Sequence, residues 1–195
     1  MTNINISPFD VVLKILQSQS LDLIAEFSKY IIGPSGQQFE KQREIITVSK
    51  NNLNYNWVTI QLASLQDMQE FGINSLVLID NIKYHIPMID FEPYTNEEFF
   101  SSSLSFIVKE LELTDIWCFR SGNAYHAYGA PLLQSNDWYQ YLGKLLTIST
   151  ELPPADKRWI GHSLKRGYSV LRWTRNTNRY KQTPTFLCHI RNNVD

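Results

Sequence analysis

The chain has 195 residues, of which 43% are hydrophobic, 19% charged and 13% aromatic, a composition typical of globular proteins. This length is sufficient for one substantial core, and we expect residues 1–195 to form a single domain. The polar start does not resemble a secretory signal, and no apolar run approaches the roughly 18 residues of a membrane helix. We therefore expect a cytoplasmic protein without a membrane partner, in which Cys118 and Cys188 remain reduced and buried.

The net charge of −1 is the sum of two unequal parts of the chain. Residues 1–156 contain 9 Lys and Arg against 18 Asp and Glu, whereas residues 157–195 contain 9 Lys and Arg against one acid, Asp195. Such an excess of cations favours a polyanion bound on one face of the protein. The alternative is a solvated basic edge on an acidic domain, and the charge distribution alone leaves both open.

In the first half of the chain, helix patterns and strand patterns follow one another. Ser7 and Pro8 indicate a helix start, because serine caps a helix and proline suits its first turn. A helical period of apolar residues predicts a second helix, and alternation of apolar with polar residues predicts strands. A hairpin is expected to turn at Asp80 and Asn81. The predicted elements are helices at 7–18, 20–31 and 64–71, strands at 44–50 and 56–63, a loop at 34–38 and a hairpin at 75–92.

The second half continues this mixture. Thr95 and Glu98 form a capping box, so a helix is expected to begin there. Residues 158–173 alternate around a turn at 165–167 and predict a hairpin. The other predicted elements are a helix at 95–113, strands at 115–120 and 125–129, a helix at 135–149 and a last strand at 183–190. Interleaved hairpins and helices favour an α+β domain with two lobes and a cleft between them.

Two carboxylates lie close together in the segment PMIDFEP. Asp90 and Glu92 are two residues apart, so their side chains point to the same face of a strand. Like charges repel at this spacing, and a divalent metal would offset the repulsion. Carboxylates that hold two metal ions suit phosphoryl transfer. The alternative is a strand end that reaches solvent, where acids are common.

A turn rich in hydrogen-bond donors follows in the segment RSGNAYH. Arg120, Ser121 and the backbone N–H groups near Gly122 are suited to cradle phosphate oxygens, and His126 reaches them from the next strand. Glycine allows a sharp turn and a close approach to a ligand. The alternative is an ordinary hairpin with a surface histidine.

A third segment begins at Asp156, a carboxylate suited to complete a metal site with the first two. A row of cations follows, as a triphosphate or a nucleic-acid backbone requires, and Trp159, Trp173 and Tyr180 are suited to stack on bases. In the alternative, the tryptophans belong to the core and the cations to a solvated face. His85 and His162 are interpreted as structural. The cations are Arg158, Arg172, Arg175, Arg179 and Lys181.

Taken in this order, the three segments resemble the catalytic core of the archaeo-eukaryotic primase superfamily, the primase-polymerases. The family's hydrophobic strand with Asp-x-Asp or Asp-x-Glu is matched by IDFE, and its serine–glycine turn leading to a histidine by SGNAYH. Its third motif, a hydrophobic residue and Asp before an arginine-led basic segment, is matched at Asp156 and by LRWTRNTNRYK. The resemblance extends over residues 83–185.

The resemblance implies a two-lobed α+β core, with an N-terminal lobe at about 1–82 and a lobe carrying the motifs at about 83–195. An RRM-like antiparallel sheet in that lobe would carry the active site. It also implies that Asp90, Glu92 and Asp156 are catalytic and bind Mg²⁺ or Mn²⁺. Ser121, His126, Arg172 and Lys181 would hold the triphosphate of the incoming nucleotide. The basic segment that includes Arg158, Arg175 and Arg179 would follow the template backbone.

The activity implied is nucleotidyl transfer that makes or extends a primer on a single-stranded template from nucleoside triphosphates. Because the chain contains neither a zinc-binding module nor a helicase domain, we expect a helicase or another replication or repair protein as a partner. Two alternatives stay open. One is a catalytically inactive relative that binds nucleotides or nucleic acid, and the other is a metal-dependent nuclease.

Overall fold

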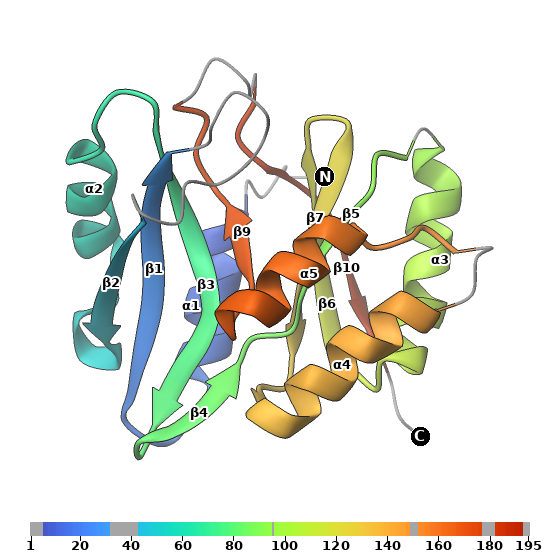
Figure 1. The fold of residues 1–195 in the computed structure, drawn as a ribbon, viewed down its shortest axis with the longest axis horizontal. Coiled ribbons are helices and arrows are strands. Elements are labelled where there is room, and N and C mark those ends of the chain that lie inside the picture. Colours follow the sequence, from blue (N-terminus) through green and yellow to red (C-terminus); the bar gives the residue numbers. More distant parts are fainter. Residues whose placement is uncertain (1–5, 32–42, 95, 149–151, 177–181, 193–195) are drawn as a thin grey trace.

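The computed structural model describes residues 6–31, 43–94, 96–148, 152–176 and 182–192. These residues form α-helices and two antiparallel sheets around one core, which confirms the predicted α+β class (Figure 1). The helices are α1 (Pro8–Gln17), the 3₁₀ helix η2 (Lys50–Asn52), α2 (Tyr55–Ala63), α3 (Glu97–Glu110), α4 (Ser135–Thr147) and α5 (Lys157–Arg166). The strands are β1 (Leu23–Ile31), β2 (Glu44–Ser49), β3 (Gln69–Ile79), β4 (Ile82–His85), β5 (Met88–Phe91), β6 (Asp115–Ser121), β7 (Ala124–Ala130), β8 (Leu133–Gln134), β9 (Val170–Arg172) and β10 (Thr185–Arg191).

The first sheet has the order β2-β1-β3-β4-β8, and its central strand β3 changes partner along its length. From Leu76 to Ile79, β3 pairs with β4, and from Gly72 to Asn74 it pairs with β9. Ser75 lies at the change, where its N–H donates to Ser169 O at 2.8 Å and its carbonyl accepts from Ile86 N at 2.8 Å. This change places the end of β9, with Arg172, beyond the end of β4.

The second sheet has the order β10-β6-β7-β5. A two-residue turn joins β6 to β7, with Ser121 opposite Ala124. On the other side of β7, Asp90 of β5 lies opposite His126. Because side chains alternate between the two faces of a strand, this register decides which residues of the motifs share a face.

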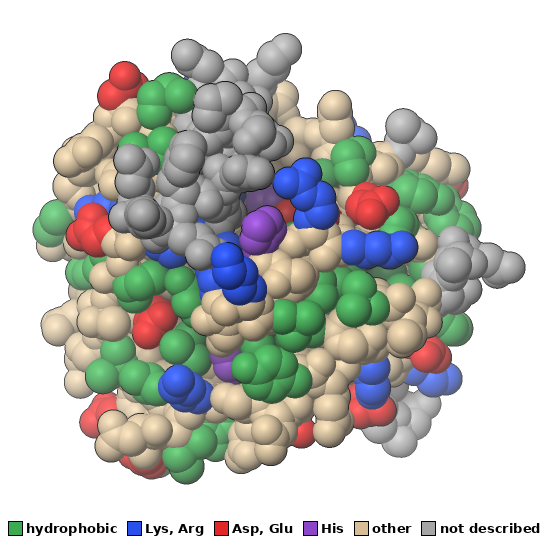
Figure 2. All heavy atoms as spheres, in the orientation of Figure 1, with side chains coloured by type: hydrophobic (Ala, Val, Ile, Leu, Met, Phe, Trp, Pro, Cys, Tyr) green, Lys and Arg blue, Asp and Glu red, His purple; other side chains and the backbone are tan. Residues whose placement is uncertain are grey.

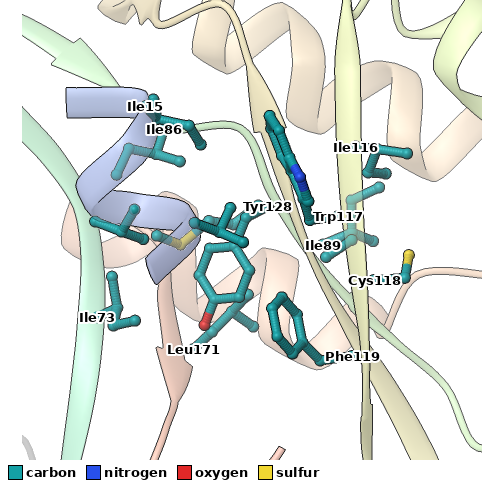
Figure 3. Packing of buried hydrophobic residues seen from close by; sticks show 14 of the residues in the cluster. Ile15, Ile73, Ile86, Ile89, Ile116, Trp117, Cys118, Phe119, Tyr128 and Leu171 are labelled. Atoms are coloured by element: carbon teal, nitrogen blue, oxygen red, sulfur yellow. The ribbon is translucent and has the colours of Figure 1, made fainter. Parts of the chain in front are cut away.

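The core fills the space between the two sheets, and α1 lies within it. Figure 3 shows Ile15 of α1 and Ile73 and Leu171 of the first sheet near Tyr128, Trp117 and Phe119 of the second. All six side chains are buried, with at most 5% of their surface exposed. The packing of apolar side chains therefore joins the two sheets.

Helix α2 packs on the first sheet, where Trp57 contacts Phe27 and Phe71, and α3, α4 and α5 cover the second sheet and its junction with the first (Figure 1). On α3, Phe100 packs on Phe91 and stacks on Tyr125, with ring centroids 4.9 and 3.9 Å apart. On α4, the hydroxyl of Tyr141 donates to Met88 O at 3.1 Å. Among the described residues, no helix has the length and apolar character needed to cross a membrane.

Several sequence predictions are confirmed. Ser7 caps α1 in a reciprocal capping box with Asp10, whose carboxylate accepts from the N–H of Ser7 at 2.6 Å. The hairpin at Asp80 and Asn81 is present, and both residues have positive φ, as its tight turn requires. The strands at 44–50, 115–120, 125–129 and 183–190 and the helices at 95–113 and 135–149 correspond to β2, β6, β7, β10, α3 and α4. Thr95 and the loop at 34–38 lie outside the described residues, and the cap of α3 is Asn96.

Other element predictions are wrong. Residues 23–31 form the strand β1 rather than a helix, since this strand is flanked by β2 and β3 and buries apolar residues on both faces. Residues 55–63 form the helix α2, which is capped by Asn54, rather than a strand. The helix at 64–71 is absent, because β3 already begins at Gln69. The strand at 82–92 is divided between β4 and β5, which belong to different sheets. The hairpin at 158–173 is the helix α5 followed by β9.

Candidate active site

Main-chain hydrogen bonds hold the first and third motifs together. Phe91 and Ala155 form an antiparallel β-bridge. On either side of it, Asp156 N donates to Asp90 O at 2.7 Å, and Glu92 N donates to Pro154 O at 3.0 Å. Asp90 and Asp156, which are 66 positions apart in the sequence, are therefore neighbours through the backbone.

Asp156 also begins helix α5. Its Oδ1 accepts from the N–H of Arg158 at 2.7 Å and of Trp159 at 3.1 Å, which satisfies two of the free N–H groups of the first turn. The partial positive charge at a helix N-terminus favours a carboxylate at this position. The cap therefore holds the Asp156 side chain at the end of α5 that meets Asp90.

His126 faces Asp90 from the neighbouring strand. Its Nε2 lies 3.5 Å from Asp90 Oδ1, and 8% of its side chain is exposed. The pKa of His126 is lowered to about 3, chiefly by burial and also by the positive charge of Arg172, while a hydrogen bond with the Arg172 backbone acts in the opposite direction. The imidazole is therefore neutral at physiological pH, and a neutral ring has one N–H donor and one acceptor nitrogen.

Arg172 connects the second motif with the acids. It lies at the end of β9 with 6% of its surface exposed. Its Nη2 donates to Ser121 Oγ at 2.9 Å, while Nη1 donates to the carbonyl of Thr174 and to that of Gln182 at 3.3 Å. The guanidinium is thus held in one orientation beside the β6–β7 hairpin.

The carboxyl group of Asp90 is strongly influenced by its surroundings. Its pKa is raised to about 8, chiefly by burial and also by the negative charge of Asp156, while the positive charge of Arg172 acts in the opposite direction. The side chain nevertheless keeps 27% of its surface exposed. The surroundings of Asp90 therefore disfavour its anionic form, and its carboxyl group can still be reached from solvent.

The turn between β6 and β7 separates two residues that were predicted to act together. Gly122 has φ +71°, and a Cβ placed on it would meet no heavy atom within 4 Å. The backbone conformation therefore favours glycine at this position of the turn. The space beside Gly122 is open. Ser121 faces Arg172, whereas Arg120 pairs with Glu97 of α3. The structure does not bring Arg120 to the site, because adjacent strand residues point to opposite faces.

The structure positions the remaining predicted residues in different ways. Glu92 follows β5 and is half-buried, but among the described residues no three His, Cys, Asp or Glu side chains are grouped closely enough to hold a metal ion. Arg158 lies on the first turn of α5, and Arg175 follows β9; both are exposed to solvent. Arg179 and Lys181, together with Tyr180, lie outside the described residues. Trp159 is buried, and its Nε1 donates to Val170 O at 2.8 Å, as the core alternative predicted.

Tyr128 is a site neighbour that the motif pattern did not identify. It is fully buried two residues after His126 on β7, so it points to the same face. Within the described part of the chain, its hydroxyl has no hydrogen-bond partner. Burial raises the pKa of Tyr128, and the charges of Arg172 and Asp90 act on it in opposite directions. The period of two along β7 was the signal that could have identified it.

The surface around α5 agrees with this arrangement. Figure 2 shows red and purple side chains set back between blue ones near the N-terminal half of α5. The site thus combines two neighbouring carboxylates, a neutral histidine and a fixed guanidinium on one side of the second sheet. Anionic oxygens and a cation are the groups that such a set can bind.

Comparison with known proteins agrees with the order of the motifs. The family model described as archaeo-eukaryotic primase 1D-like matches residues 49–185, which is more than half of the chain. No curated protein and no solved structure matches the chain. The match includes Asp90, Ser121, His126, Asp156 and Arg172, the residues that the fold brings together. The chain therefore belongs to the archaeo-eukaryotic primase 1D-like family.

Proposed function

We propose that this protein is a nucleotidyltransferase that makes or extends a primer on a single-stranded template from nucleoside triphosphates. The family supports a primase-like activity. The observation that supports the proposal most directly is the position of Arg172, which donates to Ser121 and alters the pKa values of Asp90 and His126. One buried cation of the third motif thus contacts or acts on residues of the other two.

In the proposed architecture, the sheet β10-β6-β7-β5 corresponds to the RRM-like sheet of a primase-polymerase core, and the other sheet belongs to the second lobe. Asp90 lies on the edge strand β5 of the RRM-like sheet, beside the start of α5. Arg172 comes from β9, which pairs in the other sheet. A nucleotide held by both groups would therefore bind where the two sheets meet.

The donor set at Asp90 and Asp156 fits a hard divalent cation such as Mg²⁺ or Mn²⁺, because both groups offer carboxylate oxygens. The raised pKa of Asp90 fits as well, since burial and the negative charge of Asp156 both disfavour its anion, and a bound cation would offset them. Glu92 is proposed as a further ligand. When bound, such ions lower the pKa of an attacking hydroxyl and neutralise the charge of a leaving pyrophosphate.

The side chains of this chain would bind and orient the triphosphate. Arg172 offers a fixed guanidinium for phosphate oxygens, and the hydroxyl of Ser121 and the neutral ring of His126 offer further hydrogen bonds. Because these donors are positioned before the substrate arrives, they stabilise charge that develops on the phosphates without reorganisation. Lys181 is proposed to add a second cation, and Arg158, Arg175 and Arg179 to contact the nucleic-acid backbone.

A non-catalytic role in nucleotide binding is the second candidate, and one observation favours it. Among the described residues, the acids do not form a ready-made group of three metal ligands. In that case, a nucleoside triphosphate would bind through Arg172 and Ser121 without a need for a divalent ion.

Primer extension on a single-stranded template tests the proposal. The assay supplies dNTPs or NTPs with Mg²⁺ or Mn²⁺ and compares the wild type with an Asp90→Asn/Asp156→Asn protein. We expect template-directed extension by the wild type alone. If neither protein extends the primer and both bind triphosphate equally without a divalent ion, the non-catalytic role replaces the proposal. Shortening of the primer by the wild type would instead indicate a nuclease.

A further inference from the structure

A groove lies at the other end of α5, away from the acids. A hollow of about 540 Å³ between β4, α4 and the C-terminal end of α5 is lined by residues that include Lys83, Tyr139, Arg166 and Tyr168. A second hollow of about 350 Å³ shares Arg166 and Tyr168 with the first. The two form one continuous depression, which we name the α5 groove.

The α5 groove is lined mainly by cations and aromatic rings. Arg43 and Lys165 line its second part, so four basic side chains surround it, and Glu26 is the acid among its described lining residues. Lys83 and Lys165 are exposed to solvent, as is 47% of Tyr139. Figure 2 shows blue side chains on this face over β4 and near the C-terminal end of α5.

The two arginines of the groove are held against tyrosine rings. The guanidinium carbon of Arg43 lies 4.3 Å from the ring centre of Tyr30, and that of Arg166 lies 5.8 Å from the ring centre of Tyr168. Such contacts restrict the position of the guanidinium. The groove therefore presents cations with a defined position rather than freely moving ones.

Helix α5 fixes the relation between the groove and the acids. Asp156 caps the N-terminus of α5, and Gly167, which lines the groove, ends the helix with φ +78°. Ten helical residues span about 15 Å, since each residue advances 1.5 Å. The groove is thus about three helical turns from the proposed active site.

We propose that the α5 groove binds the backbone and bases of single-stranded nucleic acid several nucleotides away from the site of synthesis. Cations along a groove neutralise phosphates, and exposed aromatic rings stack on bases of any sequence. These residues are distinct from Arg158, Arg175 and Arg179 of the third motif. The identification of the bound strand as the template rests on the proposed function.

Fluorescence anisotropy with labelled single strands of about 16 nucleotides tests this proposal on the full chain. The variant Lys83→Ala/Lys165→Ala removes two groove cations, and Lys109→Ala/Lys144→Ala removes two exposed lysines elsewhere as a matched control. We expect the groove variant to bind about tenfold more weakly at low salt and the control to bind as the wild type does. The slope of log affinity against log salt should decrease in magnitude by about 1.4, because each phosphate contact on a single strand contributes about 0.7.

A tyrosine variant separates stacking from charge. Tyr139→Ala should weaken binding about fivefold without a change in the salt slope, and Tyr139→Phe should bind as the wild type does, because stacking needs the ring and not the hydroxyl. Oligo-dT and oligo-U arms distinguish a DNA strand from an RNA strand. Equal binding by the groove variant and its lysine control would overturn the proposal.

The groove proposal and the proposed function can be tested independently. Affinity for a nucleoside triphosphate with Mg²⁺ should be the same in the wild type and in Lys83→Ala/Lys165→Ala, because neither lysine lies in the proposed active site. If the wild type extends no primer but the Lys83→Ala/Lys165→Ala variant binds strands more weakly than the wild type, the proposed function fails and the groove proposal stands. If the wild type extends primers and the variant binds strands with unchanged affinity, the groove proposal fails alone.

Discussion

Two buried histidines show how differently the two sheets use the same side chain. His85 of the first sheet stacks on Trp138, with ring centroids 4.3 Å apart, and its Nδ1 lies 3.1 Å from Ser75 Oγ. His126 of the second sheet faces the carboxylate of Asp90 and the charge of Arg172. Burial lowers the pKa of both, to about 4 and about 3.

The comparison shows that a lowered pKa alone does not identify a functional histidine. His85 has a ring to stack on and a hydroxyl beside it, so its surroundings are complete within the fold. His126 instead lies beside two charged groups, the carboxyl of Asp90 and the guanidinium of Arg172. The neighbours of a buried histidine, and not its burial, therefore distinguish a structural role from a functional one.

The largest expected effect belongs to Asp156, the carboxylate that caps α5 beside Asp90. Asp156→Asn should abolish primer extension with little change in stability, because asparagine caps a helix as well as aspartate does. Asp156→Ala should also lose about 1 kcal/mol of unfolding free energy, because alanine cannot accept from the N–H groups of Arg158 and Trp159. Extension assays and urea unfolding of both variants measure the two effects. Activity in Asp156→Asn near that of the wild type would contradict a catalytic role.

Substitution of each histidine tests directly whether His126 and His85 have different roles. His126→Gln should lower kcat/KM for the incoming nucleotide about 100-fold, the loss typical of one donor that stabilises phosphate charge. His85→Gln should leave kcat/KM within about twofold and lower the thermal midpoint, because the stack on Trp138 is lost. Steady-state kinetics on folded protein tests both. Equal losses of activity in the two variants would contradict the distinction between the two histidines.

The pH dependence of the free energy of unfolding should reveal the lowered pKa of His85. Its folded pKa of about 4 lies below the ordinary 6.5, so between these values the unfolded chain binds a proton that the folded chain does not. Stability is therefore complete above pH 6.5 and falls by about 3 kcal/mol as the pH drops to 4. His126 acts in the same direction, so the wild type is compared with His85→Phe by urea unfolding at pH 7 and 4.5. A parallel fall in both proteins would refute this assignment.

The smallest effect is expected at Arg120. Its side chain is 47% exposed and pairs with Glu97 on the face of the second sheet that α3 covers. Arg120→Ala should therefore leave nucleotide affinity and kcat within about twofold, and an exposed ion pair contributes at most about 1 kcal/mol to stability. Arg172→Ala, on the face of His126, is the contrasting variant and should weaken nucleotide binding strongly. Similar losses in both variants would contradict the separation of the two faces.

The fold was predictable where one face of an element meets water. The helix α1, with its serine cap, follows from such a pattern. The hairpin of β6 and β7 is buried on both faces, and the turn at Ser121 and Gly122 indicated it instead. The strand β1, which has a neighbour on each side, was not predictable in this way, because apolar residues on both of its faces imitate a helical period. In α5, the cap at Asp156 and the glycine at Gly167 were the signals that a hairpin prediction overlooked.

The site was predictable in its members more than in its geometry. The order of the motifs identified Asp90, Ser121, His126, Asp156 and Arg172, which the fold brings together. The separation of Arg120 from Ser121 follows from strand alternation and could have been predicted from the same residues. The bridge between Phe91 and Ala155 could not, because backbone pairing across such a distance leaves no pattern in the side chains.

That bridge has a consequence for how the chain tolerates insertions and deletions. Main-chain hydrogen bonds do not depend on which side chains occupy positions 91 and 155. Residues added to the loops between the two acids would leave their separation unchanged as long as the bridge re-forms. Insertion of one residue between Ala155 and Asp156 would instead shift Asp156 by one register position and turn its carboxylate away from Asp90.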